Sequence, residues 1–177
     1  MTKKNNLPLI IKSIRLDDKR GGLDKFVDYK IINSLKFKTK EIQISKSKEN
    51  VFRGIYMQVG KFKEAKLIKL LNGSLVWFGL DLRKNSRNYL KLYAFNLKEN
   101  ETLYLPRGFA HASYSINYSE VLILADNKYN NKHSIGINYK DKKFNKKISN
   151  YFKYKKPIIS NWHNNFEYFE IIEKKIK

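Results

Sequence analysis

The chain has 177 residues and its composition changes little along its length, so we expect one domain over residues 1–177 with a single well-buried core. It has no cysteine, which excludes disulfides, thiolate metal ligands and cysteine nucleophiles. A formal charge of +21 would indicate a nucleic-acid partner if the basic residues clustered. The lysines are instead scattered, and only six of the 37 basic residues are Arg. We therefore expect no nucleic-acid partner.

The N-terminal segment is charged, and the apolar run that follows is too short for a signal-peptide core or a membrane span. This pattern predicts a cytoplasmic protein without a membrane partner. Aromatic residues make up 14% of the chain and β-branched residues are frequent, a composition that favours strands over helices.

Short apolar segments, separated by glycines, prolines, asparagines and charged clusters, predict strands along most of the chain. We expect them at residues 7–16, 41–45, 51–58, 66–82, 90–97, 102–105, 110–116, 120–125 and 134–139. Asn72-Gly73 divides residues 66–82 into two apolar runs and predicts a type I′ hairpin there. Strands at this close spacing indicate an all-β fold: a sandwich, a barrel or a jelly roll.

The C-terminal part, residues 141–177, has a different pattern. Residues 141–156 are lysine-rich and predict a loop. Four apolar residues then recur at helical spacing, which predicts a short helix that packs on the outside of the domain: Phe166, Phe169, Ile172 and Ile176.

Three motifs resemble, in order and spacing, the dTDP-4-dehydrorhamnose 3,5-epimerase family. They are VFRGIYMQ at residues 51–58, AKLIKLLNGSLVWFGLDLRKNS at 65–86 and LYLPRGFAHASY at 103–114, with DDKRGGL near the start. The resemblance implies a cupin-type jelly roll with a short C-terminal helix, usually a homodimer. It also implies that a nucleotide-diphosphate 4-keto sugar binds inside the barrel without a metal or organic cofactor. The three histidines, at positions 111, 133 and 163, likewise show no metal-ligand spacing.

The resemblance also assigns chemical roles, and three of them fall on changed residues. Tyr56 stands where the family has its histidine base, Ile123 stands where it has its tyrosine acid, and His163 aligns with the aspartate that orients the base. Losing a positioned acid or base costs about 10²–10⁴-fold in rate. Ordinary 3,5-epimerisation is therefore expected to be weak or absent.

Other positions of the family pattern are retained. Four match substrate-binding residues, on the diphosphate, the base or the site wall: Arg20, Arg53, Gln58 and Tyr129. Five are candidates for handling protons or charge at the sugar: Tyr56, Lys66, Asp81, His111 and His163. A planar guanidinium offers paired donors to a phosphate, and a lysine can stabilise an enolate oxygen as a point charge.

Each assignment has a structural alternative. Tyr56 is either a rebuilt acid or base that leans on His163 or a packed aromatic residue. Asp81 either handles charge at the sugar or only anchors the turn that follows it. Trp77 is interpreted as a core or barrel-lining residue. Two functions stay open: a divergent nucleotide-sugar epimerase or isomerase of surface polysaccharide (deoxysugar) biosynthesis, and a catalytically inactive protein of the same family that binds a nucleotide sugar or a partner.

Overall fold

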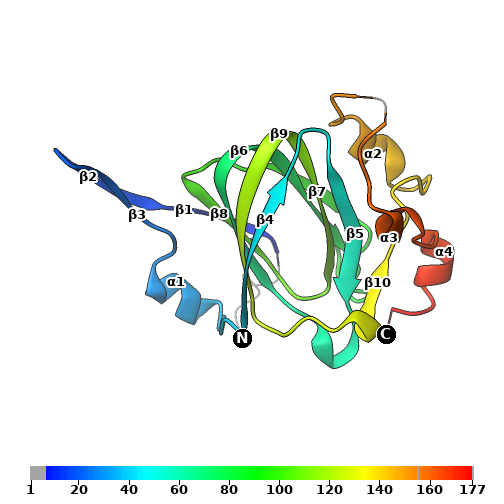
Figure 1. Ribbon diagram of the computed structural model, residues 1–177. Coiled ribbons are helices and arrows are strands. Elements are labelled where there is room, and N and C mark those ends of the chain that lie inside the picture. Colours follow the sequence, from blue (N-terminus) through cyan, green and yellow to red (C-terminus); the bar gives the residue numbers. More distant parts are fainter. Residues whose placement is uncertain (1–6, 155, 177) are drawn as a thin grey trace.

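The computed structural model describes residues 7–154 and 156–176, and strands dominate it (Figure 1). The strands are β1 (Leu9–Lys12), β2 (Ile14–Asp18), β3 (Gly21–Lys25), β4 (Glu41–Ser47), β5 (Phe52–Gln58), β6 (Lys66–Asp81), β7 (Leu92–Asn96), β8 (Glu101–Leu105), β9 (Phe109–Ala125) and β10 (Ser134–Gly136). The predicted all-β class is confirmed, and the strand positions agree with most of the expected segments.

Two long strands, β6 and β9, pair with each other along their lengths and organise the barrel (Figure 1). The first part of β6 and the last part of β9 belong to a sheet with the order β1-β8-β6-β9-β4. The last part of β6 and the first part of β9 belong to a second sheet with the order β7-β6-β9-β5-β10. All these pairs are antiparallel, and the bend in the two long strands folds one sheet over the other, as in a jelly roll.

The predicted hairpin at Asn72-Gly73 is wrong, because β6 continues through this dipeptide. The register between β6 and β9 shifts on both sides of it, which marks a β-bulge. Gly73 has a φ of 93°, and a Cβ there would lie 1.9 Å from the carbonyl oxygen of Tyr118. The glycine therefore supplies a positive φ where the strand bends, not where it reverses. The two segments predicted at 110–116 and 120–125 are likewise one strand, β9.

Side chains along the second sheet point alternately to its two faces and pack into two cores. One lies between the sheets and consists of Ile68, Leu70, Leu75, Trp77, Leu97, Leu103, Leu105, Phe109, Val121 and Ile123. The other lies between the outer face of the second sheet and the C-terminal segment, and its largest members include Phe52, Ile55, Phe78, Tyr114, Phe144, Ile148 and Phe169. The C-terminal segment therefore closes the outside of this sheet and leaves the interior between the sheets for a site.

The helices are short: α1 (Tyr29–Ser34), α2 (Asn145–Ser149), α3 (Asn161–Asn164) and α4 (Phe169–Ile172), with 3₁₀ turns at Gly60–Phe62 and Asn131–His133. α2, α3 and α4 lie beside β5 and β10, whereas α1 lies near the opposite sheet (Figure 1). No helix in residues 7–154 and 156–176 is long and apolar enough to cross a membrane.

The predicted C-terminal helix is much shorter than expected. Glu167 accepts a hydrogen bond from the Asn138 amide at 2.9 Å, and its backbone forms a bridge with Ile137. Because Glu167 is extended in this pairing, the helix begins only at Phe169. Phe169 and Ile172 are nevertheless buried, so the apolar spacing identified the residues that pack inward.

Candidate functional site

Three aromatic side chains from neighbouring strands of the second sheet form the centre of the site. Tyr56 of β5 is paired in register with His111 of β9, and Trp77 lies on β6, the other neighbour of β9. The His111 ring is 4.3 Å from the Tyr56 ring and 5.5 Å from the Trp77 ring, measured between centroids, and it is stacked on the indole at 13°. A tyrosine, a histidine and an indole therefore meet on the wall of the barrel interior.

Gly54 permits this arrangement, because β5 and β9 approach closely beside it. Its φ is 122°, and a Cβ there would lie 2.5 Å from the Ala112 Cβ and 2.6 Å from the His111 carbonyl oxygen. The register of β5 against β9 also shifts between Arg53 and Tyr56. Gly54 thus sets the positions of Tyr56 on β5 and His111 on β9.

Two further rings approach Tyr56 from the C-terminal segment. His163 of α3 is 5.7 Å from the Tyr56 ring, and Trp162 is 5.8 Å from it. Ser160 caps the helix by accepting a hydrogen bond from the His163 amide at 3.3 Å, and its hydroxyl is 2.6 Å from the His163 Nδ1. The cap therefore orients the imidazole beside the Tyr56 ring. A Tyr56–His163 pair that shares a proton stays a prediction.

Three buried polar atoms around Tyr56 have no hydrogen-bond partner among the described residues: Trp77 Nε1, His111 Nε2 and His163 Nε2. A buried polar group without a partner costs about 1–3 kcal/mol. Three in one place indicate a site that is completed by a ligand or by ordered water.

Burial fixes the protonation states of these rings. It lowers the pKa of His111 well below 6.5, and the positive charge of Lys66 acts in the same direction. Burial, with a smaller effect of Arg53, lowers the pKa of His163 to about 4. Burial raises the pKa of Tyr56 to about 12, and Glu64 is the next largest cause. Near neutral pH both imidazoles are uncharged and the phenol keeps its proton.

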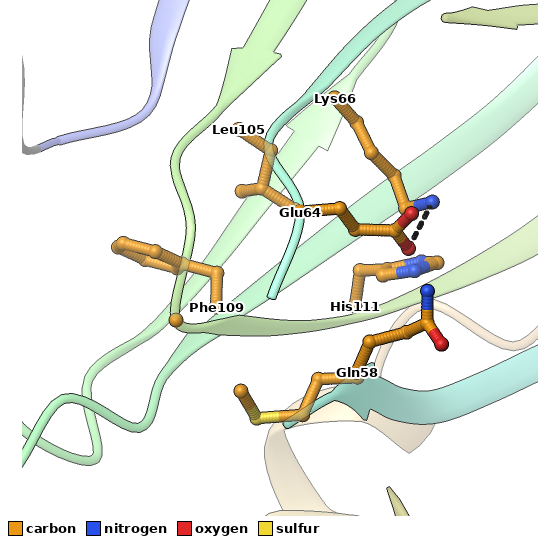
Figure 2. Close-up of a pocket in the computed structure, with 8 residues that line it drawn as sticks. Gln58, Glu64, Lys66, Leu105, Phe109 and His111 are labelled. Atoms are coloured by element: carbon orange, nitrogen blue, oxygen red, sulfur yellow. Dashed lines mark ion pairs between the residues drawn. The ribbon is translucent and has the colours of Figure 1, made fainter. Parts of the chain in front are cut away.

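One cavity beside this cluster is lined by Glu64, Lys66, Gln58 and His111 together with apolar residues (Figure 2). The Glu64 carboxylate is 2.6 Å from the Lys66 ammonium, and the side chains are only 6% and 8% exposed. Figure 2 shows the pair next to the His111 ring. The cavity therefore contains a buried ion pair with no net charge.

Asp126 holds the backbone that carries this pair. Its carboxylate accepts a hydrogen bond from the Ala65 amide at 2.7 Å, and its own amide donates to the Ala65 carbonyl at 3.1 Å. Arg107 binds the other carboxylate oxygen at 3.0 Å. Glu64 and Lys66, the residues on either side of Ala65, are thereby fixed at the start of β6.

A second cavity shares His111 with the first and is also lined by Tyr56, Trp77 and Arg53. Five serines line it as well: Ser45, Ser47, Ser113, Ser115 and Ser119. The Arg53 Nε donates to the Ser47 hydroxyl at 3.0 Å, which fixes the exposed guanidinium at the rim. The space around the two cavities amounts to about 240 and 370 Å³, which includes open solvent.

The structure does not bring every predicted residue to these cavities. Arg20 lies at the tip of the β2–β3 hairpin, where its side chain is 82% exposed and paired with Asp18. Asp81 is fully buried, and its carboxylate binds Arg83 and Ser86. The alternative assignment of Asp81, as the anchor of the turn after β6, matches these contacts.

Two further predicted residues support the loop after β9. The Gln58 side chain accepts a hydrogen bond from the Asn130 amide at 2.7 Å and donates to the Lys128 carbonyl at 3.1 Å. Tyr129, in the same loop, is 45% exposed, close enough to Tyr56 to influence its pKa. Gln58 thus positions the tyrosine that was predicted to stack on a nucleotide base.

Sequence reasoning missed Glu64 and gave Trp77 no polar role. Glu64 lies two residues before Lys66 in a lysine-rich segment, KFKEAK, where an acidic residue suggests only a surface pair. Its burial depends on the contact between Asp126 and Ala65, which links residues distant in sequence. The isolated carboxylate before a buried strand was the only available signal.

Comparison with protein-family models gives a match to dTDP-4-dehydrorhamnose 3,5-epimerase over residues 6–170. The chain belongs to this family. The dTDP-4-dehydrorhamnose 3,5-epimerase of Salmonella typhimurium is 38% identical over 88 residues, 48% of each chain. The chain thus spans about half the length of the curated relatives it matches.

Solved structures of the family match over nearly the whole chain. The dTDP-4-dehydrorhamnose 3,5-epimerase from Elizabethkingia anophelis has a TM-score of 0.84 and 26% identity, covering 97% of this chain and 96% of that chain. The dTDP-6-deoxy-D-glucose-3,5-epimerase from Legionella pneumophila, in complex with dTDP-4-keto-L-rhamnose, has a TM-score of 0.83 and 19% identity. It covers 95% of this chain and 90% of that chain. The family's cupin-type jelly roll is therefore the fold of this protein.

Proposed function

We propose that this protein binds a nucleotide-diphosphate 4-keto sugar inside its barrel and acts on it as a divergent epimerase or isomerase. The observation that carries the proposal is the group of three unpaired buried polar atoms around Tyr56. Trp77 Nε1 can only donate a hydrogen bond, so it requires an acceptor such as a sugar oxygen. The relative from Legionella pneumophila was crystallised with such a sugar nucleotide, dTDP-4-keto-L-rhamnose.

Arg53 is assigned to the diphosphate. Its Nε and one terminal nitrogen are held by Ser47 and the Lys46 carbonyl, at 3.0 and 3.1 Å. The rest of the guanidinium lies exposed at the rim of the second cavity. A guanidinium fixed in this way can receive a phosphate with little loss of side-chain entropy. Tyr129, on the exposed loop nearby, is assigned to the nucleotide base.

Ligand-induced stabilisation tests the binding part of the proposal. At about 100 times Kd a ligand stabilises a protein by about 2.7 kcal/mol, which raises the melting temperature by about 5–11 °C for a chain of this size. We expect this shift with dTDP-4-dehydrorhamnose, a smaller one with dTDP, and neither with Arg53→Ala. Lys98→Ala, outside both cavities, is the matched control. The absence of a shift with every nucleotide sugar tested would reject the proposal.

Catalysis and binding are separated by hydrogen exchange. An epimerase or isomerase of this class breaks a C–H bond next to the 4-ketone, so it incorporates deuterium from D₂O at C3 or C5 of dTDP-4-dehydrorhamnose. We expect incorporation above a protein-free control, measured by NMR. Binding without incorporation would favour the second candidate, an inactive sugar-nucleotide-binding protein, which the changes at Tyr56 and Ile123 make a specific alternative.

A homodimer completes the proposal. The hairpin of β2 and β3 projects away from the barrel (Figure 1), and Leu16 and Leu23 on it are 52% and 62% exposed. A lone two-stranded hairpin is only marginally stable in water, so it needs a surface to pack on. A second copy of this chain is the proposed occupant. Arg20, at the tip of the hairpin, would then reach the site of the other subunit instead of its own.

Light scattering coupled to size-exclusion chromatography checks the dimer. The wild type is expected to elute with twice the mass of one chain, and a double variant, Leu16→Glu with Leu23→Glu, as a monomer. Ile171→Glu, an exposed apolar position on α4, serves as the control. A wild type that is monomeric at micromolar concentration would exclude the proposed homodimer.

We also assign the protein to the cytoplasm, which cell fractionation would test.

A further inference from the structure

The rings of the aromatic cluster are poorly placed to take a proton from a ligand in the two cavities. Tyr56 keeps its proton, since burial and Glu64 raise its pKa to about 12. His163 lines neither cavity, and its Nδ1 is 2.6 Å from the Ser160 hydroxyl. His111 lines both cavities, but its ring is stacked on the Trp77 indole at 13°. If the proposed function holds, the other groups that line the cavities are the candidates for the proton acceptor.

Glu64 is the only carboxylate that lines either cavity within residues 7–154 and 156–176. Its side chain is 6% exposed, and Lys66 is its ion-pair partner at 2.6 Å. The shared wall residue His111 separates this pair from Tyr56, which lines the neighbouring cavity. A carboxylate, an ammonium and a protonated phenol are thus distributed around one imidazole, with the carboxylate and the phenol in different cavities.

Resting on the function proposed above, we propose that Glu64 is the base that removes the C–H proton next to the ketone, that Lys66 stabilises the resulting enolate, and that Tyr56 returns a proton to carbon. Glu64 then replaces the histidine base, and Tyr56, at the histidine's own position, becomes the acid. The assignment differs from the pattern expected from the sequence, where Tyr56 would be the base.

Charge conservation favours this pair. Before the reaction the cavity holds a carboxylate and an ammonium, which neutralise each other. When Glu64 takes the proton, its negative charge disappears and an equal charge forms on the ketone oxygen. Lys66 then has the enolate as its counter-ion. Proton removal by Glu64 therefore creates no unpaired charge, which matters because an unpaired charge in a buried site is costly.

The step balances in protons and electrons. The C–H bond breaks, its proton forms an O–H bond with the Glu64 carboxylate, and the electron pair of the bond becomes the enolate. Carbon then takes a proton from the Tyr56 hydroxyl, and the ketone is restored. Glu64 releases its proton to water and the Tyr56 phenolate regains one from water. If Glu64 itself returns the proton, the original stereocentre is restored and only isotope exchange is seen.

This difference gives a sharp experiment with dTDP-4-dehydrorhamnose in D₂O, followed by NMR for both deuterium incorporation and the inverted epimer. Glu64→Gln is expected to lower both deuterium incorporation and formation of the inverted epimer by about 10²–10⁴-fold. Tyr56→Phe is expected to retain incorporation within about tenfold and to lose epimer formation, because Glu64 still removes and returns a proton. Glu49→Gln, in the exposed Glu49–Lys153 pair at 2.7 Å, should leave both unchanged.

Glu64→Gln leaves Lys66 buried without a counter-ion, so a folding defect has to be separated from a chemical one. The double variant Glu64→Gln with Lys66→Met removes both charges. It is expected to unfold at a denaturant concentration near that of the wild type, to bind dTDP, and to show no incorporation above the protein-free control. Incorporation by the folded double variant within about tenfold of the wild type would overturn the proposal.

The remaining outcomes also distinguish the two proposals. A wild type that binds dTDP and dTDP-4-dehydrorhamnose without any incorporation would overturn the role of Glu64 and leave sugar-nucleotide binding intact. A wild type that binds neither would overturn the proposed function itself. Loss of incorporation in Tyr56→Phe as complete as in Glu64→Gln would overturn the separate roles of base and acid.

Discussion

Replacement of Lys66 by methionine tests whether the Glu64–Lys66 pair is a buried element of the fold. Methionine has a similar length and no charge, so the substitution leaves the Glu64 carboxylate alone at a site where the two side chains are 6% and 8% exposed. Removing one partner of a buried pair typically costs about 3–5 kcal/mol in the free energy of unfolding. For a chain of this size that corresponds to about 6–20 °C in melting temperature.

The measurement is urea unfolding followed by tryptophan fluorescence, since Trp77 is stacked on His111, which lines the same cavity as the ion pair. Lys153→Met is the comparison, because its pair with Glu49 is exposed and such pairs contribute about 0–1 kcal/mol. The double variant Glu64→Gln with Lys66→Met is expected to recover most of the loss. A cost below about 1 kcal/mol for Lys66→Met, equal to that of Lys153→Met, would refute the assignment of a buried, dehydrated ion pair.

Three further changes have defined outcomes. Gly54→Ala is expected to cost at least about 2 kcal/mol in urea unfolding, because its Cβ would lie 2.5 Å from that of Ala112 at a φ of 122°. Trp77→Phe removes an unpaired buried N–H, so it should change the stability of the free protein by less than about 1.5 kcal/mol while weakening dTDP-4-dehydrorhamnose binding about tenfold or more by calorimetry. Burial lowers the pKa of His163 from 6.5 to about 4, so the unfolded chain binds more protons in this window and stability should fall as the pH drops through it. His163→Gln should flatten this slope in urea unfolding at pH 7 and pH 5 relative to the wild type.

Local sequence patterns predicted most of the strands because apolar and β-branched residues are concentrated in them. They failed where a long-range contact decides the local structure. Asn72-Gly73 satisfies the local requirement for a turn, yet pairing with β9 on both sides keeps β6 extended. Because β6 stays paired with β9, the positive φ of Gly73 produces a bend in the strand and not a reversal of the chain. A dipeptide can supply the conformation, but the partner strand determines which structure uses it.

The candidate site divides in a similar way. Motif residues on strands, such as Tyr56 and His111, meet as expected because strand register brings them together. Arg20 also lies in a motif that resembles the family. It is on a hairpin outside the barrel, however, so its position depends on what the hairpin contacts. Sequence can identify the residue type that suits a phosphate, but it does not show where the fold places that residue.

The chemical roles depend on burial, which residue identity alone does not reveal. A tyrosine with an ordinary pKa near 10 could be assigned either as a weak base or as an acid. In the folded chain, burial and the neighbouring Glu64 raise the pKa of Tyr56 to about 12, so the hydroxyl keeps its proton near neutral pH and does not serve as a base. The same fold encloses Glu64 beside Lys66, where a carboxylate can exchange its charge with an enolate. If Glu64 is the base proposed above, a tyrosine at position 56 is compatible with catalysis, because the neighbouring carboxylate removes the proton.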